Sequence, residues 1–505
     1  MTEIELKLQV PGTALAAVEQ AVAAPGAART RLQAIYFDTP DHRLAAAGVA
    51  LRLRKEGRRW VQTLKAGPAH GMARGEHNVP LVVASGLQPV ADPTRHAGTP
   101  PHEALIAALA AREGEPPPEL VAQYRTDIRR CHRPLRSRRG TVELALDRGE
   151  ITARGPDGAE RRWPVCELEV ELLCGSPQAV IDVARRFAAR HGLWLDTRTK
   201  AERGDRLARG LAPGEAVPAV KAAPLRLSED ASAAEAWAGV LRSVLAQALP
   251  NWSEVAGGSA APEPLHQLRV ALRRLRSAQR FFEGWPGVPL PAWSDAAAAL
   301  FRELGRTRDL DVLRGGLQRE VDAALAAIGE PALSLPAAAD ASRWTDADRS
   351  RRGAVFLDVL AELTALADGQ VAGAAVALPS LAAQRLQAWH DQVLHDAGRF
   401  DRLSDEARHR LRKRLKRLRY AVEFSAGLFA RRKVERYLAD LREAQERLGE
   451  FNDVCTALAT YRPLAAQEPR AWFAVGWLVA RRAAALSACS TELKRLRKAR
   501  PFWAV

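Results

Sequence analysis

Glu3-Ile4-Glu5-Leu6-Lys7-Leu8, close to the start of the chain, alternates charged and aliphatic residues without exception. Successive side chains of an extended strand point to opposite faces. Two carboxylates and an ammonium group therefore share one face, and the aliphatic side chains share the other. Such a charged face suits a site for a divalent cation and a polyanion, because hard cations prefer carboxylate oxygens and phosphates prefer fixed positive charge. Taken alone, the stretch also fits a solvated edge strand.

The same period of two recurs through the first part of the chain, up to about residue 211. We expect strands at 34–39, 49–54, 60–65, 73–77, 124–129, 142–147 and 166–172, with helical stretches at 13–24 and 101–111. Arg52 and Arg54 share one strand face, and Glu167, Glu169 and Glu171 share another. A surface sheet would carry mainly Thr, Ser and Lys on its wet face, whereas these strands carry acids and bases together.

A barrel with a charged lumen explains this design, because its aliphatic side chains pack outward under helices and its charged side chains converge inward. Buried charges of both signs persist only when they are paired or bound to ions. We expect a group of acidic lumen residues: Glu3, Glu5, Glu167, Glu169 and Glu171. We expect them to face a group of basic residues: Lys7, Arg52, Arg54, Lys65, Arg74, Arg125 and Lys200. Such a lumen would bind a complex of a metal ion with a polyphosphate.

Several short motifs in this part of the chain resemble those of one family. Glu-x-Glu-x-Lys at 3–7 is followed by Leu-Arg-Leu-Arg (51–54), Thr-Leu-Lys (63–65), Arg-Gly-Glu (74–76), Leu-Asp-Arg-Gly (146–149), Glu-Leu-Glu-Val-Glu (167–171) and Thr-Lys-Ala-Glu-Arg-Gly (199–204). Over about residues 1–205 the chain resembles the CYTH domain of the triphosphate tunnel metalloenzymes. The resemblance implies an eight-stranded antiparallel β tunnel barrel with flanking helices. It also implies cleavage of inorganic triphosphate, nucleoside triphosphates or thiamine triphosphate with Mg²⁺ or Mn²⁺, or, in some members, adenylate cyclase activity.

The same resemblance assigns roles to the charged residues of the motifs. The metal ligands would be Glu3, Glu5, Glu167 and Glu169. The phosphates would be bound by Lys7, Arg52, Arg54, Lys65, Arg74, Arg125 and Lys200. The catalytic set would be Glu5, Lys7, Glu169, Glu171 and Lys200, with Glu171 and Asp147 near the metal or the attacking water.

The composition of the whole chain agrees with more than one domain and with an acidic ligand. The chain has 505 residues, a hydrophobic content of 47% and a formal net charge of +16. Single cores rarely grow past about 250–300 residues, and a strongly positive chain predicts an acidic partner. Five scattered cysteines without a Cys-x-x-Cys pair argue against a zinc site or a disulfide framework. Because we find neither a signal pattern nor a membrane-spanning apolar run, we expect a cytoplasmic protein.

Residues 212–228 have the proline and alanine content of a linker, which separates a tunnel domain at 1–211 from an all-α domain at 229–505. The second domain contains an internal repeat. The segment 266–276, His-Gln-Leu-Arg-Val-Ala-Leu-Arg-Arg-Leu-Arg, aligns with 409–419, His-Arg-Leu-Arg-Lys-Arg-Leu-Lys-Arg-Leu-Arg. A downstream match extends the repeat over about 266–309 and 409–453, which predicts two similar helical bundles.

Each repeat carries a basic stripe on one helix face. At about 100° per residue, a histidine and the three cations that follow it fall within an arc of about 80°, with leucines opposite. Stacked like charges destabilise an isolated helix, so a stripe present in both repeats indicates a polyanion that neutralises it. The alternative is a solvated basic face. The two stripes are His266, Arg269, Arg273 and Arg276, and His409, Arg412, Lys416 and Arg419.

Over about residues 229–505 these helices resemble the CHAD domain. The resemblance implies two pseudo-symmetric four-helix bundles that bind inorganic polyphosphate in a basic cleft. Asp309 and Asp453 would orient the basic side chains. The second repeat has Glu450, Asn452 and Cys455 in place of Arg306, Arg308 and Asp311, which argues against phosphate contacts from its loop. The phosphate contacts would come from His266, Arg269, Arg273, Arg276, His409, Arg412, Lys413, Lys416 and Arg419.

The sequence therefore predicts a multidomain α+β protein that hydrolyses inorganic triphosphate to pyrophosphate and phosphate in its tunnel, with Mg²⁺ or Mn²⁺ as cofactor. The helical domain would bind inorganic polyphosphate and hold the enzyme on cytoplasmic polyphosphate granules. Two alternatives stay open: a non-enzymatic polyphosphate-binding protein, and an adenylate cyclase that uses the same tunnel. A nucleic-acid partner is not expected, because the basic helices carry few aromatic residues for base stacking, and no membrane partner is expected.

Overall fold

The structure is a computed structural model that describes residues 2–67, 72–83, 88–111, 118–259, 261–335, 344–367, 369 and 377–503. Along residues 306–312 it describes the backbone alone. The chain forms two compact units. The barrel unit comprises residues 1–220, 249–264 and 341–368, and the helical unit comprises residues 221–248, 265–340 and 369–505. The sequence boundaries 1–211, 212–228 and 229–505 stay a prediction, and within the helical stretch the chain returns twice to the barrel unit.

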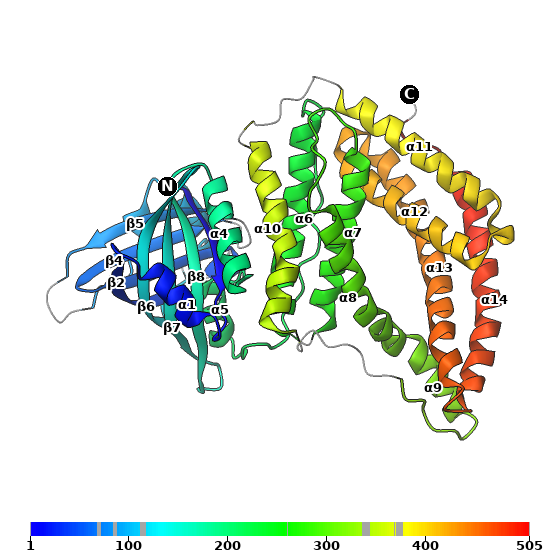
Figure 1. Cartoon of the computed structure of the whole chain (residues 1–505), viewed down its shortest axis with the longest axis horizontal. Coiled ribbons are helices and arrows are strands. Elements are labelled where there is room, and N and C mark those ends of the chain that lie inside the picture. The colour runs from blue at the N-terminus through cyan, green and yellow to red at the C-terminus, as the bar shows by residue number, and fades with distance from the viewer. Residues whose placement is uncertain are drawn as a thin grey trace. The chain divides into compact units, whose positions relative to one another are not determined.

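The barrel unit is built on one closed antiparallel sheet (Figure 1). The sheet order is β5-β4-β3-β2-β6-β7-β8-β1, and pairing of β5 with β1 closes the barrel. A short ninth strand, β9 (Trp194–Leu195), is added to β1. The eight-stranded antiparallel barrel predicted from the sequence is therefore confirmed. Its strands are β1 (Thr2–Gln9), β2 (Ala28–Asp38), β3 (Val49–Glu56), β4 (Arg59–Ala66), β5 (Ala73–Leu81), β6 (Val121–Ser137), β7 (Gly140–Arg154) and β8 (Glu160–Gly175).

Helices cover the outer wall of the barrel, where the strands expose their aliphatic face. Leu8, Leu51 and Leu168 are completely buried there, as the period of two predicts. Burial of such side chains contributes about 1.5–3 kcal/mol each. A further helix, α10 (Asp346–Ala367), packs on α4 and β9. The other helices of this unit are α1 (Leu15–Val22), α2 (Arg43–Ala46), η1 (Pro93–His96), α3 (Pro100–Ala108), α4 (Gln178–His191) and α5 (Lys200–Ala208).

Helix α5 closes one end of the barrel lumen with apolar side chains. Leu207 of α5 belongs to a buried cluster with Tyr36, Tyr124 and Ile128 from the inner faces of β2 and β6. Thr199 caps α5 by accepting a hydrogen bond from the backbone N–H of Glu202 at 3.0 Å. Because this plug fills one end, the charged part of the lumen is a blind tunnel.

The helical unit is all-α in the residues that the structure describes, as the sequence predicts. Leu268, Leu272, Leu411 and Leu415 are buried opposite the basic stripes. The arrangement of two pseudo-symmetric four-helix bundles stays a prediction. Its helices are α6 (Ala233–Ala256, whose last residues belong to the barrel unit), α7 (Pro262–Phe282), α8 (Ser294–Gly315), α9 (Leu317–Ala326), α11 (Leu378–Gly398), η3 (Phe400–Arg402), α12 (Asp405–Ser425), η4 (Ala426–Leu428), α13 (Arg431–Leu464) and α14 (Ala471–Leu496).

Among the described helices, none combines the length and the apolar character that crossing a bilayer requires. Residues 212–228 form neither helix nor strand, and their role as a linker stays a prediction.

The close packing of the plug predicts that a methyl group added to α5 destabilises the barrel unit. A Cβ atom on Gly204 of α5 would meet Cδ2 of Tyr124 at 2.1 Å. We expect Gly204→Ala to lower the free energy of unfolding of the barrel unit by about 1–3 kcal/mol, because it forces α5 away from β6. Urea unfolding followed by circular dichroism measures this change. Gly12→Ala, where nothing lies within 4 Å, is the matched control and should stay within about 0.5 kcal/mol of the wild type. Equal stability of both variants would contradict the packing of the plug.

Candidate functional site

The barrel lumen holds a cavity of about 360 Å³ lined by charged side chains of both signs. The cavity brings together most of the residues that the sequence assigns to the tunnel. Those that line it are Glu3, Glu5, Lys7, Arg52, Arg54, Lys65, Arg74, Glu169, Glu171 and Lys200. The first strand therefore places its three charged side chains inward, and the alternative of a solvated edge strand is wrong.

Two ion pairs join the acidic and basic residues of β1 and β4. Lys65 Nζ donates to both carboxylate oxygens of Glu3, at 2.7 and 2.6 Å. Lys7 Nζ donates to Glu5 at 2.5 Å. Burial alone would raise the pKa of Glu5, but the ammonium groups of Lys7 and Lys65 together hold that pKa below its ordinary value. Burial alone would likewise lower the pKa of Lys65, but the carboxylates of Glu5 and Glu3 keep it raised.

A group of carboxylates beside these pairs carries excess negative charge. Burial, followed by the neighbouring charges of Glu3 and Glu5, raises the pKa of Glu171 from 4.5 to about 7. Burial and the charge of Glu5 also raise the pKa of Glu3. Carboxylates that raise one another's pKa are a fitting donor set for a hard divalent cation, which prefers oxygen ligands and would relieve the repulsion. The residues present therefore fit Mg²⁺ or Mn²⁺.

A second acidic cluster lies beside the plug and consists of Asp147, Glu167 and Glu169. The ammonium group of Lys200 neutralises part of its charge. Lys200 Nζ lies 2.7 Å from Asp147, 2.5 Å from Glu167 and 2.8 Å from Glu169. Arg203 pairs with Glu167, which is fully buried. The burial of Lys200 opposes its charge, but these three carboxylates raise its pKa above the ordinary value. Glu167 is absent from the cavity lining, but it belongs to one cluster with Glu169, which lines the cavity and is the metal ligand predicted beside it.

Arg125 does not reach the lumen, which corrects the sequence prediction. Arg125 lies on the outer surface of β6, while Tyr124, Thr126, Ile128 and Arg130 point inward. The sequence prediction assumed that aliphatic side chains always point outward. At the plugged end the apolar face of β6 turns inward, because it packs against Leu207 of α5.

Arg130 takes the place that the sequence prediction gave to Arg125. It donates to Asp147 at 2.7 Å from both Nε and Nη2, and it also pairs with Glu169. Arg130 follows Tyr124 at an even spacing, so the aromatic residue on the same strand face is the signal that could have identified it. Other lumen residues that sequence reasoning left out of the site are Tyr36, Glu56, Glu76, His132 and Glu143.

The exposure of the lining residues shows which end of the tunnel is open. The side chains of Glu56, His132 and Glu143 are 32%, 28% and 24% exposed. Asp147 and Glu167, beside the plug, are 0% exposed. A ligand therefore enters past Glu56, His132 and Glu143 and reaches the buried charges near α5.

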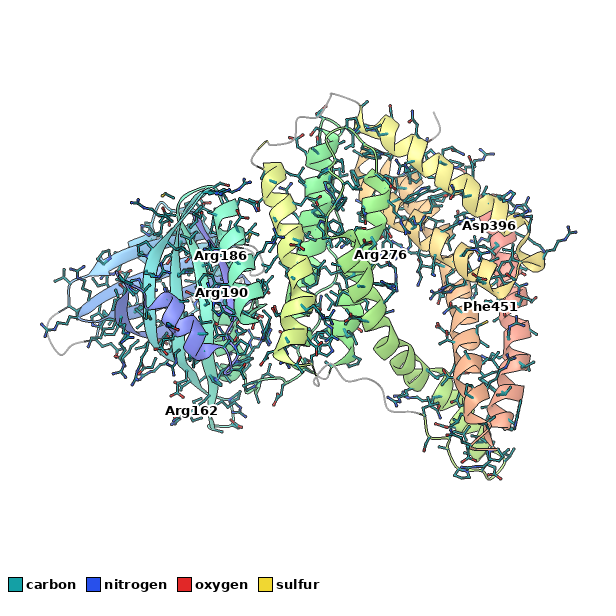
Figure 2. All side chains as sticks on the ribbon, viewed as in Figure 1. Arg162, Arg186, Arg190, Arg276, Asp396 and Phe451 are labelled. Atoms are coloured by element: carbon teal, nitrogen blue, oxygen red, sulfur yellow. The ribbon has the colours of Figure 1, made fainter. Side chains whose placement is uncertain are left out.

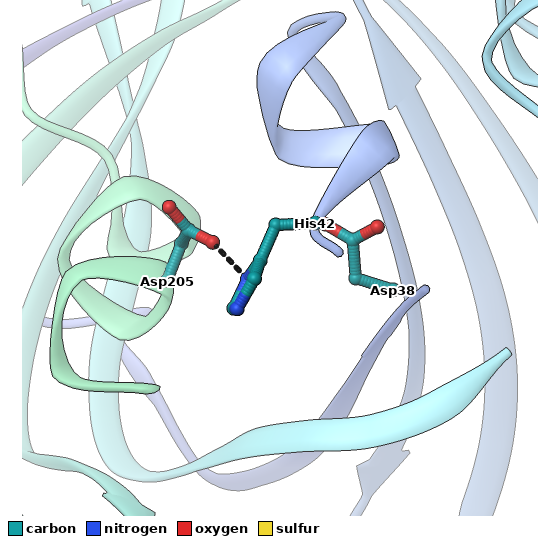
Figure 3. A group of neighbouring side chains, drawn as sticks. All are labelled: Asp38, His42 and Asp205. Atoms are coloured by element: carbon teal, nitrogen blue, oxygen red, sulfur yellow. Dashed lines mark hydrogen bonds and ion pairs between the residues drawn. The ribbon is translucent and has the colours of Figure 1, made fainter. Parts of the chain in front are cut away.

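Asp38, His42 and Asp205 form a further group with the composition of a metal site (Figure 3). Asp38, however, accepts hydrogen bonds from the backbone N–H groups of Thr39, Leu44 and Ala45 at 2.7, 2.8 and 2.9 Å. His42 Nδ1 lies 2.7 Å from Asp205 on α5. These contacts tie the turn before α2 to α5, so the group serves to hold the plug.

The helical unit contains a larger cavity, of about 1440 Å³, whose lining is strongly basic. Both predicted stripes face it: His266, Arg269, Arg273, Arg276, His409, Arg412, Lys413 and Lys416 line the cavity. Arg419 does not, because its guanidinium binds Glu423 at 2.6 Å and Gln445 at 2.8 Å. Basic residues that the sequence prediction omitted also line it: Arg280, Arg302, Arg417, Arg447 and Arg481.

Two cations that line this cavity have lowered pKa values. Burial, with help from Arg273 and Arg412, lowers the pKa of Lys416 from 10.5 to about 6. Burial and neighbouring arginines lower the pKa of Arg417 to about 10. Asp453 lines the cavity, whereas the side chain of Asp309 lies outside the described residues. The cavity therefore favours an anion that would neutralise several cations together.

Two parts of the chain are similar to known protein domains. Family models match the CYTH domain over residues 1–204 and the CHAD domain over residues 239–462. An inorganic triphosphatase of Haemophilus influenzae is 28% identical over 172 residues, which are 34% of this chain and 44% of that protein. An uncharacterised protein of Mycobacterium tuberculosis is 29% identical over 427 residues, which are 78% of this chain and 75% of that protein. The chain thus covers less than half of the triphosphatase.

Two solved structures cover one part of the chain each. The CHAD domain of the plant Ricinus communis is 29% identical, with a TM-score of 0.43, and the match covers 56% of this chain and 99% of that one. A proposed adenylyl cyclase of Hippeastrum, whose dominant activity is that of a triphosphatase, is 18% identical, with a TM-score of 0.29. That match covers 41% of this chain and 96% of the other.

The titration of Glu171 predicts how the stability of the barrel unit depends on pH. With its pKa raised to about 7, the folded protein keeps a proton that the unfolded chain releases. This contribution to stability is complete below the ordinary pKa and is lost as the pH rises through about 7. In EDTA, the melting temperature of the wild type should therefore fall more steeply between about pH 4.5 and about pH 7 than that of Glu171→Gln.

The control for this experiment is Glu150→Gln, because Glu150 lies on the outer surface of the same barrel and is 43% exposed. Its melting curves should follow the pH dependence of the wild type. Parallel curves for the wild type and Glu171→Gln would show that Glu171 titrates as an ordinary carboxyl group and would contradict the crowding of carboxylates in the lumen.

Proposed function

Because the chain carries an N-terminal CYTH domain and a C-terminal CHAD domain, we propose that it is an inorganic triphosphatase with a polyphosphate-binding module. The tunnel hydrolyses inorganic triphosphate to pyrophosphate and phosphate with Mg²⁺ or Mn²⁺. The cavity of the helical unit binds inorganic polyphosphate. One observation carries the proposal: a single buried lumen holds carboxylates, which suit a divalent cation, interleaved with guanidinium and ammonium groups, which suit phosphate oxygens.

The carboxylates of the lumen are suited to the cation. Glu3 and Glu5 would hold it, with Glu171 beside them. The cation supplies neutralisation of the charge that develops on the phosphate oxygens. Glu171 is the proposed general base, since a carboxylate with a pKa near 7 is matched to proton transfer at neutral pH. Its carboxylate would take the proton of the water molecule that attacks the terminal phosphorus.

The guanidinium and ammonium groups of the lumen are suited to the phosphate chain. Arg52 is held in place through a hydrogen bond that its Nη1 donates to the hydroxyl of Tyr36 at 3.0 Å. Arg52, Arg54, Lys65 and Arg74 reach the lumen from neighbouring strands and would contact successive phosphate oxygens. Phosphoryl transfer depends almost entirely on such positioning and on fixed charge. Of the aromatic rings in the described lining, Tyr36 stacks on Tyr124 and accepts the hydrogen bond of Arg52, and His132 pairs with Glu143.

The proposal is tested by phosphate release from inorganic triphosphate, ATP and long-chain polyphosphate, each with Mg²⁺ and with Mn²⁺. We expect metal-dependent turnover of inorganic triphosphate above all. Glu5→Gln should reduce kcat/KM by at least about 100-fold, because it removes one charged ligand of the cation. Glu150→Gln, outside the lumen, should match the wild type.

Other outcomes of this experiment identify the alternatives. Formation of cyclic AMP from ATP would identify an adenylate cyclase. Absence of turnover with tight polyphosphate binding would identify a binding protein. Full activity of Glu5→Gln would overturn the assignment of the tunnel.

The helical cavity predicts that polyphosphate binding takes up protons. Lys416, with its pKa lowered to about 6, is mainly neutral at neutral pH. Phosphate contacts favour the ammonium form, so affinity should fall as the pH rises above about 6, and binding at about pH 7.5 should take up as much as about one proton. Calorimetry in buffers of different ionisation enthalpy measures this number.

Two variants make this measurement specific. Lys416→Arg should remove the share of the proton uptake that Lys416 contributes, since a guanidinium stays charged. Lys433→Arg, on the exposed surface of α13, should leave it unchanged. Binding without proton uptake by the wild type would show that Lys416 stays charged in the empty cavity or makes no contact with the phosphate chain.

A further inference from the structure

Three arginines of α7 share one aromatic ring. The guanidinium carbons of Arg269, Arg273 and Arg276 lie 5.0, 5.4 and 5.2 Å from the centre of the Phe301 ring. Phe301 belongs to α8 and lines the same cavity as the arginines. Each distance is within the range of a cation–π contact, which is about 6 Å. Arg276 can be followed on α7 in Figure 2.

Arg269 is also fixed to the backbone of α8. Its Nη1 donates a hydrogen bond to the carbonyl oxygen of Phe301 at 3.3 Å. A Cβ atom on Gly305 would meet that same nitrogen at 2.9 Å, so the glycine leaves the space that the guanidinium fills. Two independent features of α8, an aromatic ring and a glycine, are therefore shaped to the arginines of α7.

An aromatic ring holds a guanidinium in a different way from a carboxylate. The negative face of the ring attracts the cation, but it carries no net charge and leaves the positive charge available to a ligand. A carboxylate in the same place would cancel that charge. Phe301 therefore contacts all three arginine side chains and itself adds no negative charge.

The second repeat lacks this arrangement. The offset of 144 residues that relates Gly305 to Gly449 makes Gln445 the counterpart of Phe301, and the offset of 143 residues that relates His266 to His409 makes Arg419 the counterpart of Arg276. Gln445 accepts a hydrogen bond from Arg419 Nε at 2.8 Å, and Glu423 pairs with Arg419 at 2.6 Å. Arg419 is thereby neutralised and does not line the cavity. The last cation of the stripe therefore differs between the repeats. Arg276 contacts an aromatic ring and lines the cavity, whereas Arg419 pairs with a carboxylate and does not.

We propose that Phe301 is a positioning residue that holds Arg269, Arg273 and Arg276 in one row, so that the first repeat binds an extended phosphate chain along that row. This inference rests on the proposed polyphosphate binding of the helical unit. Seven residues of α-helix separate the first and the last arginine, which corresponds to about 10 Å along the helix axis. A row of that length contacts several phosphates of a linear chain, whereas a compact anion such as pyrophosphate engages only part of it.

The test compares four proteins: wild type, Phe301→Leu, Phe301→Trp and Gln445→Leu. All four carry the same net charge, so a purely electrostatic cavity would bind polyphosphate equally well in each. Affinities for long-chain polyphosphate and for pyrophosphate are measured by calorimetry at one salt concentration, because anion binding to clustered cations depends steeply on salt. Circular dichroism and melting temperature verify that each variant is folded.

We expect Phe301→Leu to bind long-chain polyphosphate about tenfold more weakly, the equivalent of about 1.4 kcal/mol. Its affinity for pyrophosphate should change by less than about twofold, because a short anion does not need the whole row. Phe301→Trp should restore the long-chain affinity, since tryptophan makes the strongest cation–π contacts. Gln445→Leu, the matched change in the second repeat, should bind like the wild type.

The inference and the proposed function fail in different ways. If the wild type does not bind long-chain polyphosphate, the proposed function of the helical cavity is wrong. If the wild type binds it and Phe301→Leu binds it equally well, the positioning role of Phe301 is wrong. Equal losses for long-chain polyphosphate and pyrophosphate, or an equal loss in Gln445→Leu, would reduce Phe301 to a general packing role and would also overturn the inference.

Discussion

The contact of the Lys200 ammonium with three carboxylates is the interaction on which the barrel unit depends. Asp147, Glu167 and Glu169 come from β7 and β8, and two of them are completely inaccessible to solvent. Leaving one such charge unpaired would cost about 3–5 kcal/mol. Lys200 is also the first residue of α5, whose apolar face fills one end of the lumen. Charge pairing and apolar packing thus place the same helix, and together they turn a barrel that could be open at both ends into a blind tunnel.

The blind tunnel gives its charges a strength that they would lack on a surface. Lys7, Lys65 and Arg130 are already paired and oriented before a ligand arrives. Fixed charges in a water-poor site need little reorganisation when charge develops on a substrate, which is the main source of electrostatic catalysis. The carboxylates around Glu171, by contrast, repel one another. A proton or a cation relieves this repulsion.

The lining of the helical cavity is composed in the opposite way. In the tunnel, acids and bases are balanced and interleaved, whereas the cavity between α7, α8 and α12 gathers mainly cations. Burial, together with the neighbouring cations, lowers the pKa of Lys416 to about 6 and that of Arg417 to about 10. Phe301 contacts three of these cations, Arg269, Arg273 and Arg276, without supplying negative charge. A balanced lumen suits a small substrate that must be oriented and released, and an unbalanced cavity suits a long anion that neutralises many cations at once.

The sequence by itself determined the barrel, its charged inner face and the two basic stripes of the helical unit. These follow from local periodicity: a period of two places Glu3, Glu5 and Lys7 on one strand face, and a period near 3.6 places His266 and Arg269 on one helix face. Which of these charges stay available was decided by tertiary structure. Arg125 points outward and Arg130 inward because the plug helix reverses the apolar face of β6, and Glu167 is taken by Lys200 and Arg203.

Arg419 shows the same limit in the helical unit, since its repeat position predicts a phosphate ligand but Gln445 and Glu423 hold it elsewhere. Periodicity along one element tells which side chains share a face. It says nothing about the residues of other elements that meet that face, and those partners determine whether a charge is paired, braced or left for a ligand.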